Sequence, residues 1–106
     1  MPSDQFIIVL TTCPIDTDTD SLAATLVEER LAACVNILPP MRSVYRWKDA
    51  IERADERQIV IKTTKARLTA LEARIRTLHP YDVPEFVVLP IESGSTDYLS
   101  WLAENT

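Results

Sequence analysis

The stretch QFIIVLTT, residues 5–12, decides the fold that we expect for this chain. It is apolar at consecutive positions (6–10), and the pair Cys13-Pro14 ends it. A short run of this kind predicts a β-strand that is buried on both faces. The stretch EFVVLPI, residues 85–91, has the same two-sided apolar pattern and predicts a second buried strand. A sheet that contains two such strands needs cover on both of its faces.

The acidic segment DTDTD, residues 16–20, predicts the start of a helix. Short polar side chains cap free backbone amides there, and carboxylates complement the positive end of the helix dipole. An apolar stripe at helical spacing follows this segment. Its members are Leu22, Ala23, Leu26, Val27, Ala33 and Cys34. We therefore expect the first helix to reach Cys34 and to place this thiol in the core as a small apolar group.

Two further helices are predicted in the second half of the chain. The first has an apolar stripe with charged residues elsewhere, and His79-Pro80 ends it. Its apolar residues are Leu68, Leu71, Ile75 and Leu78. The second is short and is capped by Ser-Thr-Asp at residues 95–97. It carries Tyr98, Trp101 and Leu102.

Between the first two helices, residues 34–47 and 51–63 are rich in β-branched and aromatic residues and predict a long β-hairpin. Its turn falls near Lys48-Asp49, without the Asn-Gly pair that favours a tight turn. Pro39-Pro40 cannot donate to a central strand and therefore predicts a bulge, bend or edge in the first arm.

The resulting order predicts an α+β fold: a ferredoxin-like βαββαβ antiparallel sheet with an extra C-terminal helix. The first two helices then cover one face of the sheet. The last strand is apolar on both sides, which favours burial against other copies of the chain.

Composition is that of one ordinary globular domain over residues 1–106. The chain is 46% hydrophobic and 25% charged, with a net charge of −5. This negative charge excludes nucleic acid as an expected partner. The apolar run at 6–10 is far too short to span a membrane, and no basic signal-peptide start precedes it. We therefore expect no membrane insertion and a cytoplasmic location.

Small residue counts exclude several kinds of site. Gly94 is the only glycine, so the glycine-rich loops that bind nucleotide phosphates and the GxSxG hydrolase motif are absent. Cys13 and Cys34 are too few and too far apart for a disulfide framework, and we expect free thiols. No nucleophile beside a base can be identified, so we expect no enzyme activity.

Five ordered blocks of the sequence together resemble the CutA divalent-ion tolerance family, and the resemblance covers nearly the whole chain. The blocks are ERLAACVN (29–36), SVYRW (43–47), IKT (61–63), HPYDVPE (79–85) and YLSW (98–101). The resemblance implies a ferredoxin-like subunit in a homotrimer with a long central hairpin, similar in build to PII-type signalling proteins. It also implies a link with tolerance to copper and other divalent ions.

The resemblance also implies which positions of this chain correspond to the family's copper ligands. The cysteine of the family's copper-site pattern falls at Thr11, and its histidine pair falls at Leu78 and His79, so only His79 is retained. Cys13 lies two residues beyond Thr11 and is the candidate replacement thiolate. No cofactor is required, and copper or zinc is the candidate ion. The alternative role for His79 is to cap the helix that it ends.

Other candidate residues could line a cleft or a subunit interface. Tyr45, Trp47 and Tyr81 are large amphipathic aromatics, which interfaces favour. Lys62, Tyr81 and Glu85 could converge as a cation, a hydroxyl and a carboxylate, with structural ion pairing as the alternative.

Three functions stay open at this stage: a metal-binding tolerance protein, a PII-like small-molecule sensor, and a scaffold whose trimer is the functional unit. Saturable copper or zinc binding favours the first, a nucleotide or anion favours the second, and neither favours the third.

Overall fold

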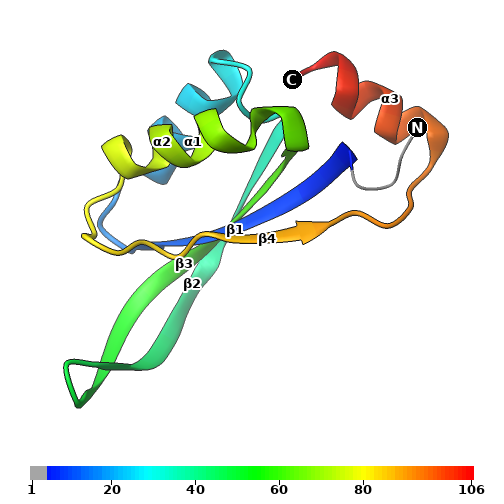
Figure 1. Cartoon of the computed structure of the whole chain (residues 1–106). Helices are drawn as coiled ribbons and strands as arrows, with labels where there is room; N and C mark the ends of the chain where they lie inside the picture. Colours follow the sequence, from blue (N-terminus) through cyan, green and yellow to red (C-terminus); the bar gives the residue numbers. More distant parts are fainter. Residues whose placement is uncertain (1–4) are drawn as a thin grey trace.

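The computed structural model describes residues 5–106 and shows a four-stranded antiparallel sheet with three α-helices (Figure 1). The elements in chain order are β1 (Phe6–Pro14), α1 (Thr19–Glu28), β2 (Cys34–Trp47), β3 (Ala50–Thr64), the 3-10 turn η2 (Lys65–Arg67), α2 (Leu68–Leu78), β4 (Val87–Pro90) and α3 (Thr96–Glu104). The predicted α+β element order is confirmed. None of the helices among these residues is long and apolar enough to cross a membrane.

The strand order across the sheet is β2-β3-β1-β4, and every neighbouring pair is antiparallel. β3 pairs with β1 over the whole length of β1, from Phe6 opposite Thr64 to Pro14 opposite Glu56. The first and second strands are therefore separated by the third, as the ferredoxin-like order requires.

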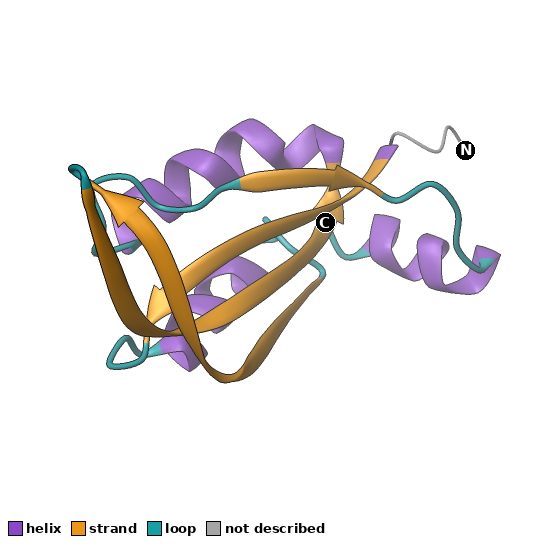
Figure 2. Ribbon diagram, turned by 90° about the horizontal axis from the view of Figure 1, so that it is seen from below, coloured by secondary structure: helices purple, strands orange, loops and turns teal. Residues whose placement is uncertain are grey.

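Helices α1 and α2 lie together above one face of the sheet (Figure 1). The core between them is built from odd-numbered strand residues, since successive side chains on a strand point to opposite faces. It contains Val9 of β1, Ile59 and Ile61 of β3, Leu26 of α1 and Leu71 of α2, all with no exposed surface. α3 packs at one end of the sheet, where Leu102 forms a small buried cluster with Phe6 and Ala33. The view from below looks onto the face that α1 and α2 leave open (Figure 2).

The β2–β3 hairpin extends well beyond the rest of the molecule (Figure 1). The whole molecule, hairpin included, measures 45 × 25 × 24 Å. The predicted irregularity at the proline pair is confirmed, because the pairing register shifts between Ile37 and Pro40. The turn also lies where it was predicted. Lys48 and Asp49 both adopt positive φ, 49° and 66°, which is the backbone of a type I′ hairpin turn.

The expected extension of the first helix to Cys34 is wrong. α1 ends at Glu28, and Cys34 begins β2 as a half-buried residue. Arg30 takes a left-handed φ of 58°, its amide donates to Val27, and the Leu31 amide donates to Leu26. These two bonds form a Schellman motif, which satisfies the last carbonyls and turns the chain toward the sheet.

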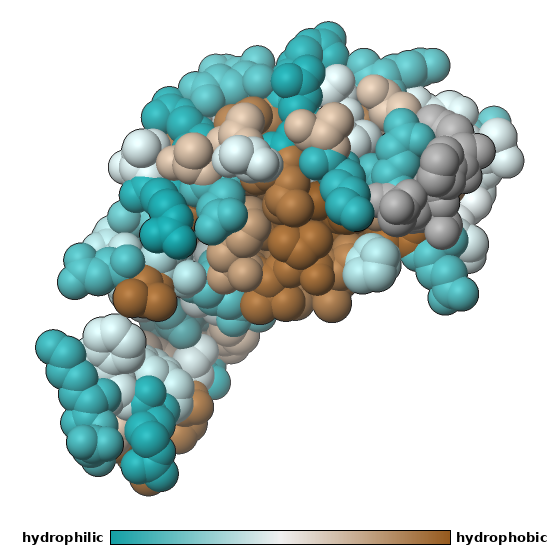
Figure 3. All heavy atoms as spheres, viewed as in Figure 1, coloured by the Kyte–Doolittle hydropathy of each residue, from teal (hydrophilic) through white to brown (hydrophobic). Residues whose placement is uncertain are grey.

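The last strand is shorter than predicted. β4 pairs with β1 only from Leu10 opposite Val87 to Ile7 opposite Pro90. Glu85 lies in the loop before this strand, and its carboxylate accepts a hydrogen bond from the Gln58 side chain on β3 at 2.9 Å. The apolar side chains of β4 are exposed in the single chain, and apolar surface gathers over this strand (Figure 3).

Candidate functional site

An open cleft of about 790 Å³ lies between the projecting part of the hairpin and the loop at residues 80–85. Its lining includes three aromatic and three acidic side chains, and the lining residues include no lysine, arginine or histidine. These six are Tyr45, Trp47 and Tyr81 with Glu56, Asp82 and Glu85. The predicted cleft residues Tyr45, Trp47, Tyr81 and Glu85 are therefore brought together.

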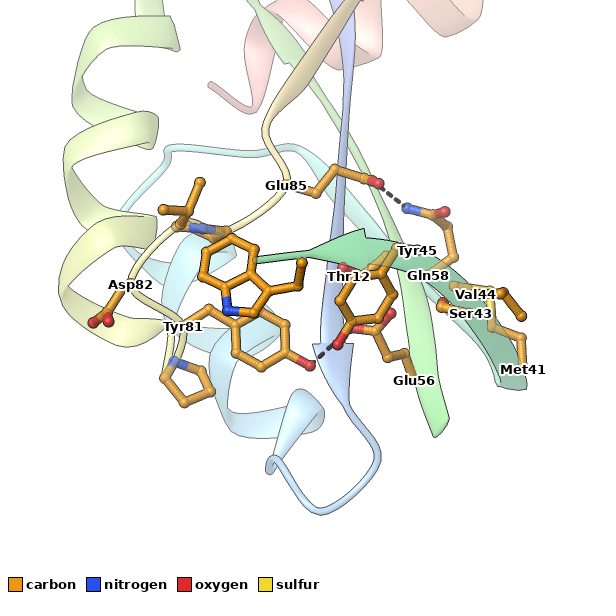
Figure 4. A pocket seen from close by; sticks show the side chains of 14 residues that line it. Thr12, Met41, Ser43, Val44, Tyr45, Glu56, Gln58, Tyr81, Asp82 and Glu85 are labelled. Carbon is orange, nitrogen blue, oxygen red and sulfur yellow. Dashed lines mark hydrogen bonds between the residues drawn. The ribbon is translucent and has the colours of Figure 1, made fainter. Parts of the chain in front are cut away.

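The hairpin sets the orientation of its cleft residues through the proline bulge. Before the bulge, Ile37 lies opposite Ile59 on the helix-covered face, whereas after it Met41 lies opposite Glu56. The extra residue moves the odd-numbered positions of β2 to the open face. Tyr45 and Glu56 consequently point into the same space (Figure 4).

Glu56 forms the floor of the cleft. Only 5% of the residue is exposed, and its carboxylate accepts a hydrogen bond from the Tyr81 hydroxyl at 2.8 Å (Figure 4). Burial raises the pKa of the Tyr81 hydroxyl, and its hydrogen bond to Glu56 and the charge of Glu56 raise it further. Tyr81 therefore keeps its proton and serves as a donor rather than as a nucleophile.

Gln58 makes two hydrogen bonds at the edge of the cleft where Glu85 lies. The Gln58 side-chain amide donates both to the Thr11 carbonyl, at 2.7 Å, and to the Glu85 carboxylate, at 2.9 Å. Since Thr11 belongs to β1 and Glu85 to the loop before β4, this amide joins three parts of the chain. It fixes the loop against the sheet and holds the Glu85 carboxylate at the cleft (Figure 4).

His79 anchors the same loop at its start. It is the C-cap residue of α2, with its backbone amide donating to the Ile75 carbonyl. Nδ1 of the ring accepts from the Tyr81 amide at 3.1 Å, and Nε2 donates to the carbonyl of Thr12. The ring also lies against Tyr81, with centroids 4.9 Å apart. Both ring nitrogens are thus occupied, and the histidine positions Tyr81 over Glu56.

Cys13 lies at the end of β1, next to the Thr12 carbonyl that His79 contacts, and has no exposed surface. Burial, with a further contribution from the Glu56 charge, raises the pKa of its thiol to about 11. A thiolate is the form that binds metal, so this environment opposes ligation. Among residues 5–106 no three His, Cys, Asp or Glu side chains converge as a metal site. In this conformation, His79 and Cys13 do not fit a tight metal centre.

Lys62 lies apart from the cleft. It sits on β3 opposite Ile8 of β1 and Cys34 of β2, at the end of the sheet away from the turn. Its ammonium lies 5.9 Å from the ring centroid of Tyr98 on α3. The structure therefore does not bring Lys62 together with Tyr81 and Glu85, and gives it a contact between sheet and helix instead.

Sequence reasoning missed the floor of the site, formed by Glu56 and Gln58. A signal was present, because alternation along the second arm places both residues on the face opposite Ile59 and Ile61. The alternation predicts that Glu56 and Gln58 share the face away from the helices, but it does not predict that the loop at 80–85 folds over that face.

The family model for the CutA1 divalent ion tolerance protein matches residues 7–105. The chain belongs to the CutA1 family. The divalent-cation tolerance protein CutA of Thermus thermophilus is 48% identical over 99 residues, which cover 93% of this chain and 96% of that protein. The predicted family is thereby confirmed.

Solved CutA1 structures agree with the fold over almost the full chain. The T. thermophilus structure has a TM-score of 0.92 at 46% identity and covers 95% of this chain and 98% of its own. CutA1 from Oryza sativa also has a TM-score of 0.92, at 39% identity, with 98% and 95% covered. This CutA1-family chain therefore shares its hairpin and its sheet order with bacterial and plant relatives.

Proposed function

We propose that this CutA1-family chain is a divalent-cation tolerance protein that acts without catalysis and works as a homotrimer. The observation that carries the tolerance role is the family match over residues 7–105. The Tyr81 hydroxyl supports a role without catalysis, since it donates a hydrogen bond to the Glu56 carboxylate and its pKa is raised, so that it serves as a donor rather than as a nucleophile.

Exposed apolar surface supports the trimer. On β4, Val87, Val88 and Leu89 are each more than a third exposed, and on the hairpin so are Val44 and Ile51. Apolar patches of this kind mark protein–protein contacts. In an antiparallel sheet, an apolar edge strand is also a place where a neighbouring chain can pair.

Sedimentation equilibrium tests the assembly. At micromolar concentration we expect a mass three times that of the chain, with no monomer. A monomer that persists at this concentration would contradict the trimer, while leaving the family assignment intact.

Divalent-ion binding at His79 and Cys13 is the second part of the proposal. A neutral imidazole and a thiolate suit copper better than magnesium, which prefers oxygen ligands. Binding must be weak, because His79 has to give up its contact with the Thr12 carbonyl and Cys13 is buried as a thiol.

Calorimetry on the metal-free protein tests this site. We expect weak copper binding, weaker magnesium binding, and a loss of copper affinity in His79→Ala that deepens when Cys13→Ser is added. Glu28→Gln, on the exposed side of α1, is the control and should bind copper as the parent does. If the double variant also binds as the parent does, copper binds elsewhere on the protein.

The charge of the cleft bears on the alternative role as a PII-like sensor. A nucleotide or another anion needs basic side chains or a glycine-rich loop. The cleft offers Glu56, Asp82 and Glu85 and no basic side chain in its lining. This observation favours the tolerance and scaffold roles over an anion sensor.

We propose the cytoplasm as the compartment, and the free thiols of Cys13 and Cys34 agree with a reducing environment. One solved relative, from Archaeoglobus fulgidus, is named a periplasmic divalent cation tolerance protein. Fractionation of cells that express the unaltered protein tests this proposal, and we expect the protein in the cytoplasmic fraction rather than in the periplasmic one.

A further inference from the structure

The cleft contains a buried carboxylate whose charge the chain does not balance. Glu56 is only 5% exposed, and among the described residues the one hydrogen-bond donor to its carboxylate is the neutral hydroxyl of Tyr81. Within residues 5–106 the structure gives this carboxylate no ion pair. A buried carboxylate is unfavourable unless a cation or several hydrogen-bond donors compensate for the water that it loses. A cation placed in the cleft would supply that compensation.

The walls of the cleft fit a particular kind of cation. Tyr45, Trp47 and Tyr81 present three aromatic rings beside the carboxylate of Glu56. Aromatic faces attract cations that have a weakly held hydration shell, above all alkylated ammonium and guanidinium groups. The volume of about 790 Å³ is in the range of small-molecule sites.

A bare metal ion fits the same residues less well. The two fixed carboxylates are held by different partners, since Glu56 bonds to Tyr81 and Glu85 bonds to Gln58. Among the described residues, no three acidic, histidine or cysteine side chains converge on one point. Divalent ions need several oxygen ligands around one centre, whereas an organic cation needs one carboxylate and an apolar wall.

We propose that this cleft binds an organic ammonium or guanidinium group, with Glu56 as its counter-ion and Tyr45, Trp47 and Tyr81 as its aromatic cage. His79 acts in this site as a positioning residue, because it holds the Tyr81 backbone. The cation has two sources with the same chemistry: a free amine, or an arginine or lysine side chain of a second copy of the chain. This site is separate from ion tolerance and does not depend on it.

Choline and its neutral isostere, in which carbon replaces the ammonium nitrogen, form the matched pair of probes. Calorimetry and tryptophan fluorescence on the full chain should show choline binding at least about tenfold tighter than the isostere binds, a difference of about 1.4 kcal/mol. Glu56→Gln removes the charge but keeps the size and an acceptor for Tyr81, and should abolish this preference. Glu28→Gln makes the same chemical change at an exposed position of α1 and should leave the preference unchanged.

The variants also separate the two sources. If choline does not bind but Glu56→Gln, unlike Glu28→Gln, weakens self-association, the cation comes from a neighbouring copy. Tyr81→Leu, which removes another ring of the cage, should then produce the same loss, and it provides a second test if Glu56→Gln fails to fold. Equal binding of choline and its isostere, together with unchanged association in both cleft variants, would overturn the proposal.

Discussion

Two buried threonines show that the effect of a buried hydroxyl on stability depends on whether it has a hydrogen-bond partner. Thr11 on β1 and Thr63 on β3 both lie on the helix-covered face and have almost no exposed surface. The Thr63 hydroxyl donates to the Leu31 carbonyl at 2.8 Å. In the part of the chain that the structure describes, the Thr11 hydroxyl has no hydrogen-bond partner. An unpaired buried hydroxyl destabilises the fold, whereas a paired one contributes to its stability.

Replacing these threonines with valine should therefore have opposite effects. We expect Thr11→Val to raise the free energy of unfolding by about 1 kcal/mol, since it removes an unpaired polar group and keeps the shape. Thr63→Val is the matched control and should lower it by about 1 to 2 kcal/mol, because it leaves the Leu31 carbonyl without its donor. Urea denaturation at one fixed protein concentration measures both. A loss of stability in Thr11→Val would mean that its hydroxyl has a partner.

The site could be predicted from single residues only in part. Tyr45, Trp47, Tyr81 and Glu85 stand out in the sequence as large amphipathic rings and a charge at segment ends, and all four line the cleft. Glu56 did not stand out, because an acidic residue in a polar strand normally faces solvent. What buries it is the loop at 80–85, which His79 and Gln58 fasten to the sheet through contacts distant in the sequence.

At the scale of elements, patterns with a local cause were predicted well. The hairpin, its turn, the proline bulge and the caps of α2 and α3 each follow from residues close together in the chain. The end of α1 did not, because Arg30 occupies the left-handed position that glycine usually marks. The apolar stripe also runs on through Leu31 and Ala33, which are buried after the helix has ended.

Two substitutions of Arg30 measure how much the left-handed backbone after α1 costs in stability. Arg30→Gly should be about 1 kcal/mol more stable than Arg30→Ala, because glycine adopts a positive φ without a steric penalty. Both variants lose the guanidinium contact to the Glu104 carbonyl at 3.2 Å, so the comparison cancels that loss. Thermal unfolding of the two variants side by side measures the difference. Equal stability would show that the left-handed conformation carries no cost at this position.

At the scale of the whole molecule, the single chain leaves its longest element without support. The hairpin projects away from the core, and near its turn Trp47 is 46% exposed and Tyr45 is 43% exposed (Figure 1). An arm of this length gains little by burial within one small domain. Its exposed aromatic residues are accounted for if it packs against neighbouring copies, where tryptophan and tyrosine often contribute most of the binding energy.

Trp47→Ala should therefore weaken the trimer. If the ring is buried between copies, its removal should cost about 2 kcal/mol or more per contact, which raises the dissociation constant more than about tenfold. Trp101→Ala is the control: this ring is similarly exposed, at 40%, but lies on α3 beside Tyr98. Sedimentation equilibrium over a dilution series compares both variants with the parent. If Trp47→Ala assembles as tightly as Trp101→Ala and the parent, Trp47 lies on a free surface, and its place beside Glu56 then serves the bound cation alone.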